Sequence, residues 1–171
     1  MRIDIVGLPA TGKSTLARAL ATKLSIPHLH LDQFWFEGGG RQSAHATLNL
    51  EEVRTHVRAR VAEALRADSW VSDGTYLHVQ DMIAPRADQI IFLDIPLWRR
   101  LLHHAKRVLR PDTRHKGINV WDDLLFFWEI IRRTYASTPK LRRFIRDHAD
   151  KVITLRSYKE VDAYVEQVCA H

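Results

Sequence analysis

Eight residues near the N-terminus have the types and the spacing that bind the phosphates of a nucleotide. They match the P-loop pattern at every specified position, and they read Gly7-Leu8-Pro9-Ala10-Thr11-Gly12-Lys13-Ser14, followed by Thr15. The two glycines let the backbone turn its N–H groups around phosphate oxygens, and the helix that follows adds the positive end of its dipole. We therefore expect residues 7–15 to bind ATP, with Lys13 on the β- and γ-phosphates and Ser14 as a ligand of Mg²⁺.

Three aspartates follow predicted strands, at the edge of a parallel sheet where ligands bind. Asp73 precedes Gly74 and is predicted to hold Mg²⁺ through water, although an Asp-Gly pair also forms turns. Asp32 is predicted to orient or deprotonate the hydroxyl group of an acceptor, although it could instead cap a helix or form a turn. Asp94 is expected only to cap the helix that follows it.

Aromatic side chains accompany the predicted acceptor residue. Trp35 follows Asp32 by three positions beside a glycine run, and Tyr76 follows Asp73 at the same spacing. We expect the acceptor to bind near Asp32, Trp35, Arg41, Asp73 and Tyr76. The histidines have no zinc-ligand spacing with cysteine, so metal binding through histidine is not expected.

Positive charge is concentrated in one part of the chain. Residues 97–146 contain 13 Lys and Arg against four Asp and Glu, whereas the rest of the chain contains 13 against 16. Most of these basic residues are expected to form a solvated surface. Because guanidinium groups bind phosphate through paired hydrogen bonds, Arg107 and Arg110 are predicted to stabilise the transferring phosphoryl group, and Arg132 and Arg133 to bind substrate.

The pattern of apolar residues predicts strands that alternate with helices. Runs rich in Ile, Val and Leu predict buried strands at residues 2–6, 28–31, 70–73, 89–94 and 151–155. Helical spacing predicts helices at residues 13–24, 50–67, 96–109, 120–135, 140–147 and 158–170. This alternation implies a parallel sheet and an α/β fold. Residues 37–43 and 109–119 are predicted to be loops, which could close over a ligand or could be only flexible surface connections.

Length and composition favour one globular domain. The 171 residues are 46% hydrophobic with a net charge of +6, which excludes wholesale disorder. No apolar run approaches the roughly 20 residues that span a bilayer, and the N-terminus has no signal-peptide pattern. The single cysteine, Cys169, cannot form an internal disulfide. We expect a cytoplasmic protein that is a monomer or a homodimer.

Together these motifs resemble the P-loop kinases of the adenylate kinase-like superfamily, which includes nucleoside and nucleoside monophosphate kinases. Within it, the chain is more similar to the bacterial group called "DNA topology modulation protein". The resemblance rests on residues 7–15, 30–35, 70–76 and 86–96, and continues through residues 128–133 and 155–157.

The resemblance implies a three-layer α/β/α fold with five parallel strands in the order 2-3-1-4-5 and a helical lid at about residues 109–128. It also implies ATP·Mg²⁺ as the phosphoryl donor, with lid arginines closing over the phosphates. The chain lacks the Asp-Gly-Phe-Pro-Arg motif of adenylate kinases, because Thr75-Tyr76-Leu77 follows Asp73-Gly74, and His103 stands where an arginine is expected. The resemblance therefore does not identify AMP as the acceptor.

Three functions are compatible with these patterns. The leading prediction is a phosphotransferase that moves the γ-phosphate of ATP to a nucleotide, a nucleoside or another small metabolite. The alternatives are a nucleotide-dependent DNA-associated regulatory protein, whose basic segment would follow duplex phosphates, and an ATPase without an acceptor. Because the basic segment stands alone in a mildly acidic chain, it fits a lid over a triphosphate better than a duplex-binding surface.

Overall fold

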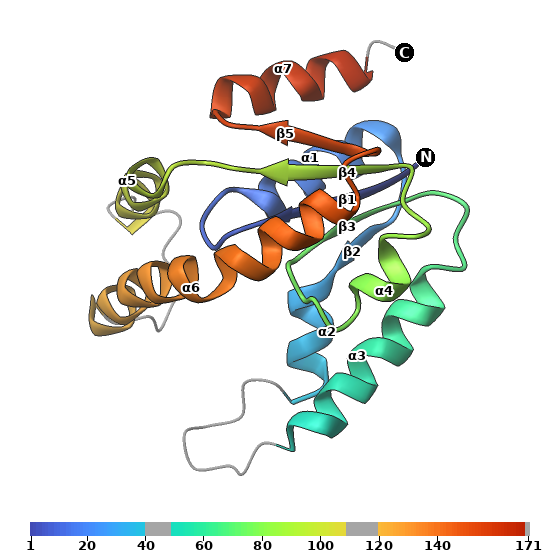
Figure 1. Ribbon diagram of the computed structural model, residues 1–171, viewed down its shortest axis with the longest axis horizontal. Coiled ribbons are helices and arrows are strands. Elements are labelled where there is room, and N and C mark those ends of the chain that lie inside the picture. The colour runs from blue at the N-terminus through green and yellow to red at the C-terminus, as the bar shows by residue number, and fades with distance from the viewer. Residues whose placement is uncertain (40–48, 109–119, 170–171) are drawn as a thin grey trace.

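In the computed structural model, five parallel strands form one sheet in the order β2-β3-β1-β4-β5 (Figure 1). The structure describes residues 1–39, 49–108 and 120–169. The strands are β1 (Arg2–Gly7), β2 (His28–His30), β3 (Trp70–Asp73), β4 (Gln89–Leu93) and β5 (Val152–Leu155). The predicted α/β fold and its strand order are confirmed.

Strand β1 lies in the middle of the sheet and is buried on both faces. Ile3 and Ile5 on one face and Val6 on the other have no exposed surface. The register pairs Ile5 with Asp73 on β3 and Gly7 with Leu93 on β4. Because the strands are parallel, Gly7 and Asp73 come to the same edge of the sheet, where ligands bind in folds of this class.

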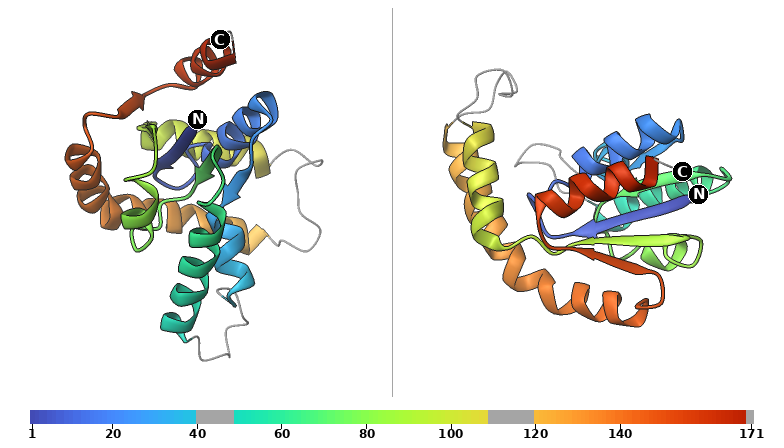
Figure 2. Two further views of the ribbon diagram at one scale, coloured as in Figure 1. Left: turned by 90° about the vertical axis from the view of Figure 1, so that its right-hand side faces the viewer. Right: turned by 90° about the horizontal axis from the view of Figure 1, so that it is seen from above.

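Helices cover both faces of the sheet. They are α1 (Lys13–Leu24), α2 (Leu31–Glu37), α3 (Leu50–Ala64), α4 (Gln80–Ile83), α5 (Leu97–Val108), α6 (Val120–Asp147) and α7 (Tyr158–Cys169). Helices α1 and α7 cover one face, and α3, α4 and the C-terminal part of α6 cover the other (Figures 1 and 2).

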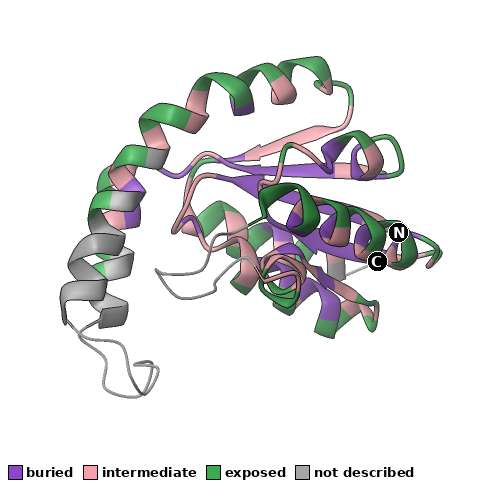
Figure 3. Cartoon of the chain, turned by 90° about the horizontal axis from the view of Figure 1, so that it is seen from below, coloured by how far each residue is buried: buried purple, intermediate pink, exposed green. Residues whose placement is uncertain are grey.

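The hydrophobic core has one half on each face of the sheet. Leu16 and Leu20 of α1 pack with Ile3 of β1 on one face, and Val57 of α3 packs with Ile90 of β4 on the other. Buried residues follow the strands and the inward sides of these helices (Figure 3). The apolar spacing predicted for α1 and α3 therefore does bury one side of each helix.

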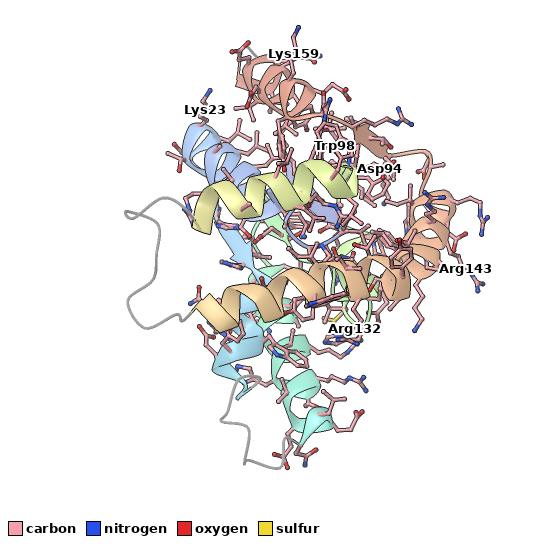
Figure 4. The ribbon with its side chains drawn as sticks, turned by 90° about the vertical axis from the view of Figure 1, so that its left-hand side faces the viewer. Lys23, Asp94, Trp98, Arg132, Arg143 and Lys159 are labelled. Atoms are coloured by element: carbon pink, nitrogen blue, oxygen red, sulfur yellow. The ribbon has the colours of Figure 1, made fainter. Side chains whose placement is uncertain are left out.

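Beyond the carboxyl ends of the strands, α5 and the first half of α6 run side by side (Figures 2 and 4). The helices predicted at residues 120–135 and 140–147 form one helix, α6, with Pro139 inside it. Burial of Ile130 and Leu141 on either side of the proline stabilises the continuous helix against the lost backbone hydrogen bond. Residues 120–128 of the predicted lid begin α6, and residues 109–119 lie outside the described residues.

Two short helices differ from the predicted pattern. Helix α2 begins directly after β2 and contains Asp32, so this aspartate lies in the first turn of a helix. Helix α4, between β3 and β4, was not predicted. None of the helices in the described ranges is both long and apolar enough to cross a membrane.

Candidate functional site

The glycine-rich loop connects β1 to α1 at the edge where the strands end. A Cβ atom on Gly7 would lie 2.9 Å from the backbone carbonyl oxygen of Leu93, so this position accepts only glycine without a shift of β4. Gly12 takes a left-handed conformation with φ 94° at the start of α1. No described side chain caps this helix N-terminus, so a ligand can approach the positive end of the helix dipole.

Hydrogen bonds within the loop fix its shape. The Thr11 hydroxyl and the Lys13 ammonium group each donate to the Leu8 carbonyl oxygen at 2.9 Å. The Gly7 N–H donates to Thr75 Oγ1 at 3.1 Å, and that hydroxyl donates back to the Gly7 carbonyl at 2.7 Å. Thr75 thus joins the loop to the segment that follows β3. These contacts hold the backbone of the loop in place.

Ser14 and Asp73, the two predicted metal ligands, lie in direct contact. The Ser14 hydroxyl donates to Asp73 Oδ2 at 2.5 Å, and only 1% of Asp73 is exposed. On the other oxygen, His28 Nε2 lies 2.7 Å from Asp73 Oδ1, and His30 Nδ1 lies 3.5 Å from it. Burial alone would raise the pKa of Asp73, but hydrogen bonds with His28 and Ser14 outweigh it and lower this pKa.

The contact between His28 and Asp73 was not predicted from the sequence. His28 and His30 occupy alternate positions of β2, so they lie on the same face of the sheet, and their rings stack at 5.5 Å. The register pairs His30 with Asp73. Once β2 is known to pair with β3, this spacing is enough to bring both histidines to the carboxylate.

Asp32, Trp35 and Tyr76 form a second cluster at the same edge. The Tyr76 hydroxyl donates to Asp32 Oδ1 at 2.6 Å. The rings of Trp35 and Tyr76 stack with centroids 5.6 Å apart, and the His78 ring meets Tyr76 edge-on at 5.8 Å. Burial, together with the nearby charges of Arg54 and Arg58, lowers the pKa of His78. The predicted acceptor residues Asp32, Trp35 and Tyr76 are thus brought together.

The predicted arginines are described to different extents. Arg132 lies exposed on α6 (Figure 4). Arg107 of α5 and Arg133 of α6 have described backbones but not described side chains, and Arg41 and Arg110 lie outside the described residues. The roles of all five remain predictions.

Arg100 is a site residue that the charge pattern did not distinguish from its basic neighbours. Its side chain is 1% exposed and donates from Nη1 to the Pro9 carbonyl of the loop at 3.1 Å. Its Nη2 donates to Thr134 Oγ1 of α6 at 3.1 Å. The neighbouring leucines do not indicate that Arg100 points inward, because Leu102 is itself exposed.

A cavity opens beside the loop, between α1 and α7. Its volume is about 440 Å³, and it is lined by side chains that include Thr11, Thr15, Lys23, Tyr158 and Asp162. This volume lies in the range of small-molecule sites. Because Thr11 and Thr15 belong to the predicted phosphate-binding segment, the cavity adjoins this segment.

A buried strand, a glycine-rich loop, a helix that begins at Lys13-Ser14 and an acidic residue at the end of the adjacent strand define a P-loop NTPase. The family model of the AAA domain matches residues 3–110. Since this match covers more than half of the chain, the protein belongs to that family.

The solved structures that are similar to the chain over almost its whole length include two shikimate kinases. Shikimate kinase from Bacteroides thetaiotaomicron has a TM-score of 0.60 at 19% identity, covering 98% of this chain and 96% of that one. Shikimate kinase from Aquifex aeolicus has a TM-score of 0.55 at 18% identity, covering 98% and 93%. At these identities the likeness shows a shared fold. None of the curated proteins compared with the chain matches it.

Proposed function

We propose that this P-loop NTPase is a phosphotransferase that moves the γ-phosphate of ATP·Mg²⁺ to the hydroxyl group of a small acceptor. One observation carries the proposal: two carboxylates at the same edge of the sheet have different surroundings. Asp73 contacts Ser14 of the loop, where a metal-binding carboxylate is needed. Asp32 contacts Tyr76 beside stacked aromatic rings, where a base for an acceptor is needed.

ATP would bind with its phosphates on residues 7–15 and its nucleoside in the cavity beside Thr15 and Tyr158. The N–H groups at the start of α1 have no described side-chain cap and would bind phosphate oxygens. The Lys13 ammonium group contacts the Leu8 carbonyl of the same loop, so only a local rotation would bring it to the β- and γ-phosphates. The cavity of about 440 Å³ is large enough for a nucleoside.

The residues at the strand ends fit Mg²⁺. The Ser14 hydroxyl and the Asp73 carboxylate are oxygen donors, which Mg²⁺ prefers. The lowered pKa of Asp73 keeps its carboxylate ionised at neutral pH. His28, at 2.7 Å, would hold this carboxylate in a fixed orientation. When bound, Mg²⁺ would neutralise negative charge on the β- and γ-phosphate oxygens.

The acceptor hydroxyl would bind near Asp32, against the rings of Trp35 and Tyr76. Asp32 would take the proton as the acceptor oxygen forms its bond to the γ-phosphorus and the bond from that phosphorus to ADP breaks. Arg107 and Arg110 would stabilise the charge on the transferring group, and Arg41, Arg132 and Arg133 would bind substrate. The two similar structures named above are shikimate kinases by name, which supports a small-molecule acceptor.

The test is an acceptor panel in which ADP release is measured with Mg²⁺ and ATP. The panel includes nucleosides, nucleoside monophosphates, sugars and hydroxy acids, and one acceptor class is expected to raise ADP release above the basal rate. Lys13→Ala should lower this rate by about two to three orders of magnitude, because it removes the positive charge that would stabilise the transferring phosphoryl group. Lys159→Ala, at an exposed position on α7 (Figure 4), is the control for loss of a lysine.

Two results would contradict the proposal. Hydrolysis that no acceptor increases would identify an acceptor-independent ATPase. Duplex DNA binding that weakens steeply with salt, without phosphate transfer to any acceptor, would favour the DNA-associated alternative.

A further inference from the structure

Arg100 is a buried cation that has no role in the phosphotransfer described above. Its guanidinium group is almost completely enclosed between α5, α6 and the loop. Among the described residues, no carboxylate lies within ion-pairing distance of it, and its Nε atom is buried without a hydrogen-bond partner. Arginine stays charged even when buried, and a buried charge without a counter-charge is costly. The free-energy cost of burying the Arg100 charge therefore has to be offset by another interaction of this side chain.

Arg100 contacts the peptide that precedes Ala10, a loop residue in the left-handed conformation. Arg100 Nη1 donates to the Pro9 carbonyl at 3.1 Å, and the next residue, Ala10, has a φ of 61°. This left-handed conformation costs an L-residue about 1–2 kcal/mol. The charge-assisted hydrogen bond from Arg100 is of the same order, about 1.5–3 kcal/mol, so it is sufficient to hold the Pro9–Ala10 peptide in this orientation.

The orientation of this peptide decides where the Ala10 N–H points. None of the peptide bonds of residues 1–39 is cis, and the C=O and N–H of a trans peptide point in opposite directions. The Ala10 N–H therefore points away from Arg100. Within the described part of the chain, no group accepts a hydrogen bond from it. A hydrogen bond at the carbonyl also polarises the peptide and makes its N–H a stronger donor.

Arg100 also connects the loop to α6. Its Nη2 donates to Thr134 Oγ1 at 3.1 Å, and that hydroxyl donates to the Ile130 carbonyl one turn earlier in α6. Ile130 is itself fully buried. The guanidinium group is thus held at a fixed point of α6, and so is the loop carbonyl that it contacts.

We infer that Arg100 is a positioning residue for phosphate binding: it holds the strained Pro9–Ala10 peptide so that the Ala10 N–H is directed at a phosphate group of the nucleotide. The inference rests on the proposed function, because it needs phosphates on the loop. Within the chain, Asp94 attracts Arg100 without forming an ion pair with it, and the negative charge of the bound phosphates adds to this attraction. The ligand concerned is a di- or triphosphate, independent of the attached nucleoside.

The test is calorimetric titration of ATP, ADP and inorganic tripolyphosphate into the full chain with Mg²⁺. Arg100→Gln should weaken binding of all three by about tenfold, the loss of one charge-assisted hydrogen bond. Arg100→Lys keeps the charge but cannot reach both acceptors, and should weaken binding by about threefold. Arg99→Gln is the matched control, because Arg99 is the adjacent arginine and lies over the Trp98 ring at 5.0 Å, and it should change binding by less than about twofold.

A spectroscopic measurement separates positioning from a general structural effect. The amide ¹⁵N and ¹H shifts of Ala10 should move in folded Arg100→Lys and stay in place in Arg99→Gln. Unchanged Ala10 shifts in Arg100→Lys, or affinities of this variant within about twofold of wild type, would overturn the inference. Both measurements use Arg100→Lys, so they remain decisive if Arg100→Gln does not fold. Weaker binding of ATP with unchanged binding of tripolyphosphate would overturn it as well. If the wild-type chain binds none of the three ligands, the proposed function itself has failed.

Discussion

The two halves of the candidate site are built differently. The donor region, which consists of residues 7–15 with His28 and Asp73, is formed by backbone and by buried polar groups with mutual hydrogen bonds. The acceptor region, which consists of Asp32, Trp35, Tyr76 and His78, is formed by half-buried side chains on α2 and after β3. Under the proposed function, the backbone of the loop would hold the phosphates, whereas side chains would determine which acceptor binds.

The largest expected effect concerns the stability of the core beneath the donor region. Asp4 has no exposed surface, and its Oδ1 accepts a hydrogen bond from Ser72 at 2.6 Å, next to Asp73. Burial raises the pKa of Asp4 from 3.8 to about 7. Between these values the folded state binds more protons than the unfolded state, so the free energy of unfolding falls as pH rises through this window. The fall from this group approaches about 4 kcal/mol.

Asp4→Asn removes this titration and keeps an oxygen that accepts from Ser72. Urea unfolding of both proteins at about pH 4.5 and about pH 8 measures the effect. The variant should gain stability relative to wild type at the higher pH, while the acceptor-region variants below should show no such gain. A stability difference between Asp4→Asn and wild type that is the same at both pH values would contradict the assignment.

The next largest effect is expected for Asp73→Asn in the donor region. Removing the carboxylate should lower turnover by about two to three orders of magnitude, because metal charge stabilisation is worth several kcal/mol. It should also abolish the increase in ATP affinity that Mg²⁺ causes. Steady-state turnover and ATP titrations with and without Mg²⁺ measure both effects. Asp94→Asn, which changes an aspartate just after strand β4, is the control and should retain both properties.

The donor region was more predictable from the sequence than the acceptor region, for physical reasons. The loop is specified by residue types at fixed spacing, since Gly7 has no room for a side chain and Lys13-Ser14 must begin a helix. Helix α2, by contrast, is only seven residues long and forms because Leu31 is buried and Trp35 packs on the core. Such tertiary stabilisation of a short helix leaves no periodic signal in the sequence.

Burial and strand register account for the other differences. Pro139 predicts a helix end, but packing on both sides of it keeps α6 continuous. Arg100 is one of 13 basic residues in its segment, and a count of charges does not reveal which of them is enclosed. His28 reaches Asp73 through the pairing of β2 with β3, which is a property of the fold.

The smallest effect in this series is expected in the acceptor region. Asp32→Asn should lower turnover by about a hundredfold, the usual contribution of a general base, and should leave ATP affinity unchanged. Tyr76→Phe removes only the hydrogen bond to Asp32 and should cost less than about tenfold. Turnover with the acceptor found in the panel, together with ATP titration, measures both variants. Equal losses of ATP affinity and turnover in Asp32→Asn would contradict the division into donor and acceptor regions.

Transfer of the γ-phosphate itself tests the central claim most directly. ATP labelled with ¹⁸O in the γ-phosphate is incubated with the protein, Mg²⁺ and a metabolite mixture, and the products are identified by mass spectrometry. The label should appear in a phosphorylated organic acceptor with the wild-type chain and with Lys159→Ala, and should be almost absent from it with Lys13→Ala. Label found in inorganic phosphate alone, with no labelled organic product, would contradict the claim that this protein is a phosphotransferase.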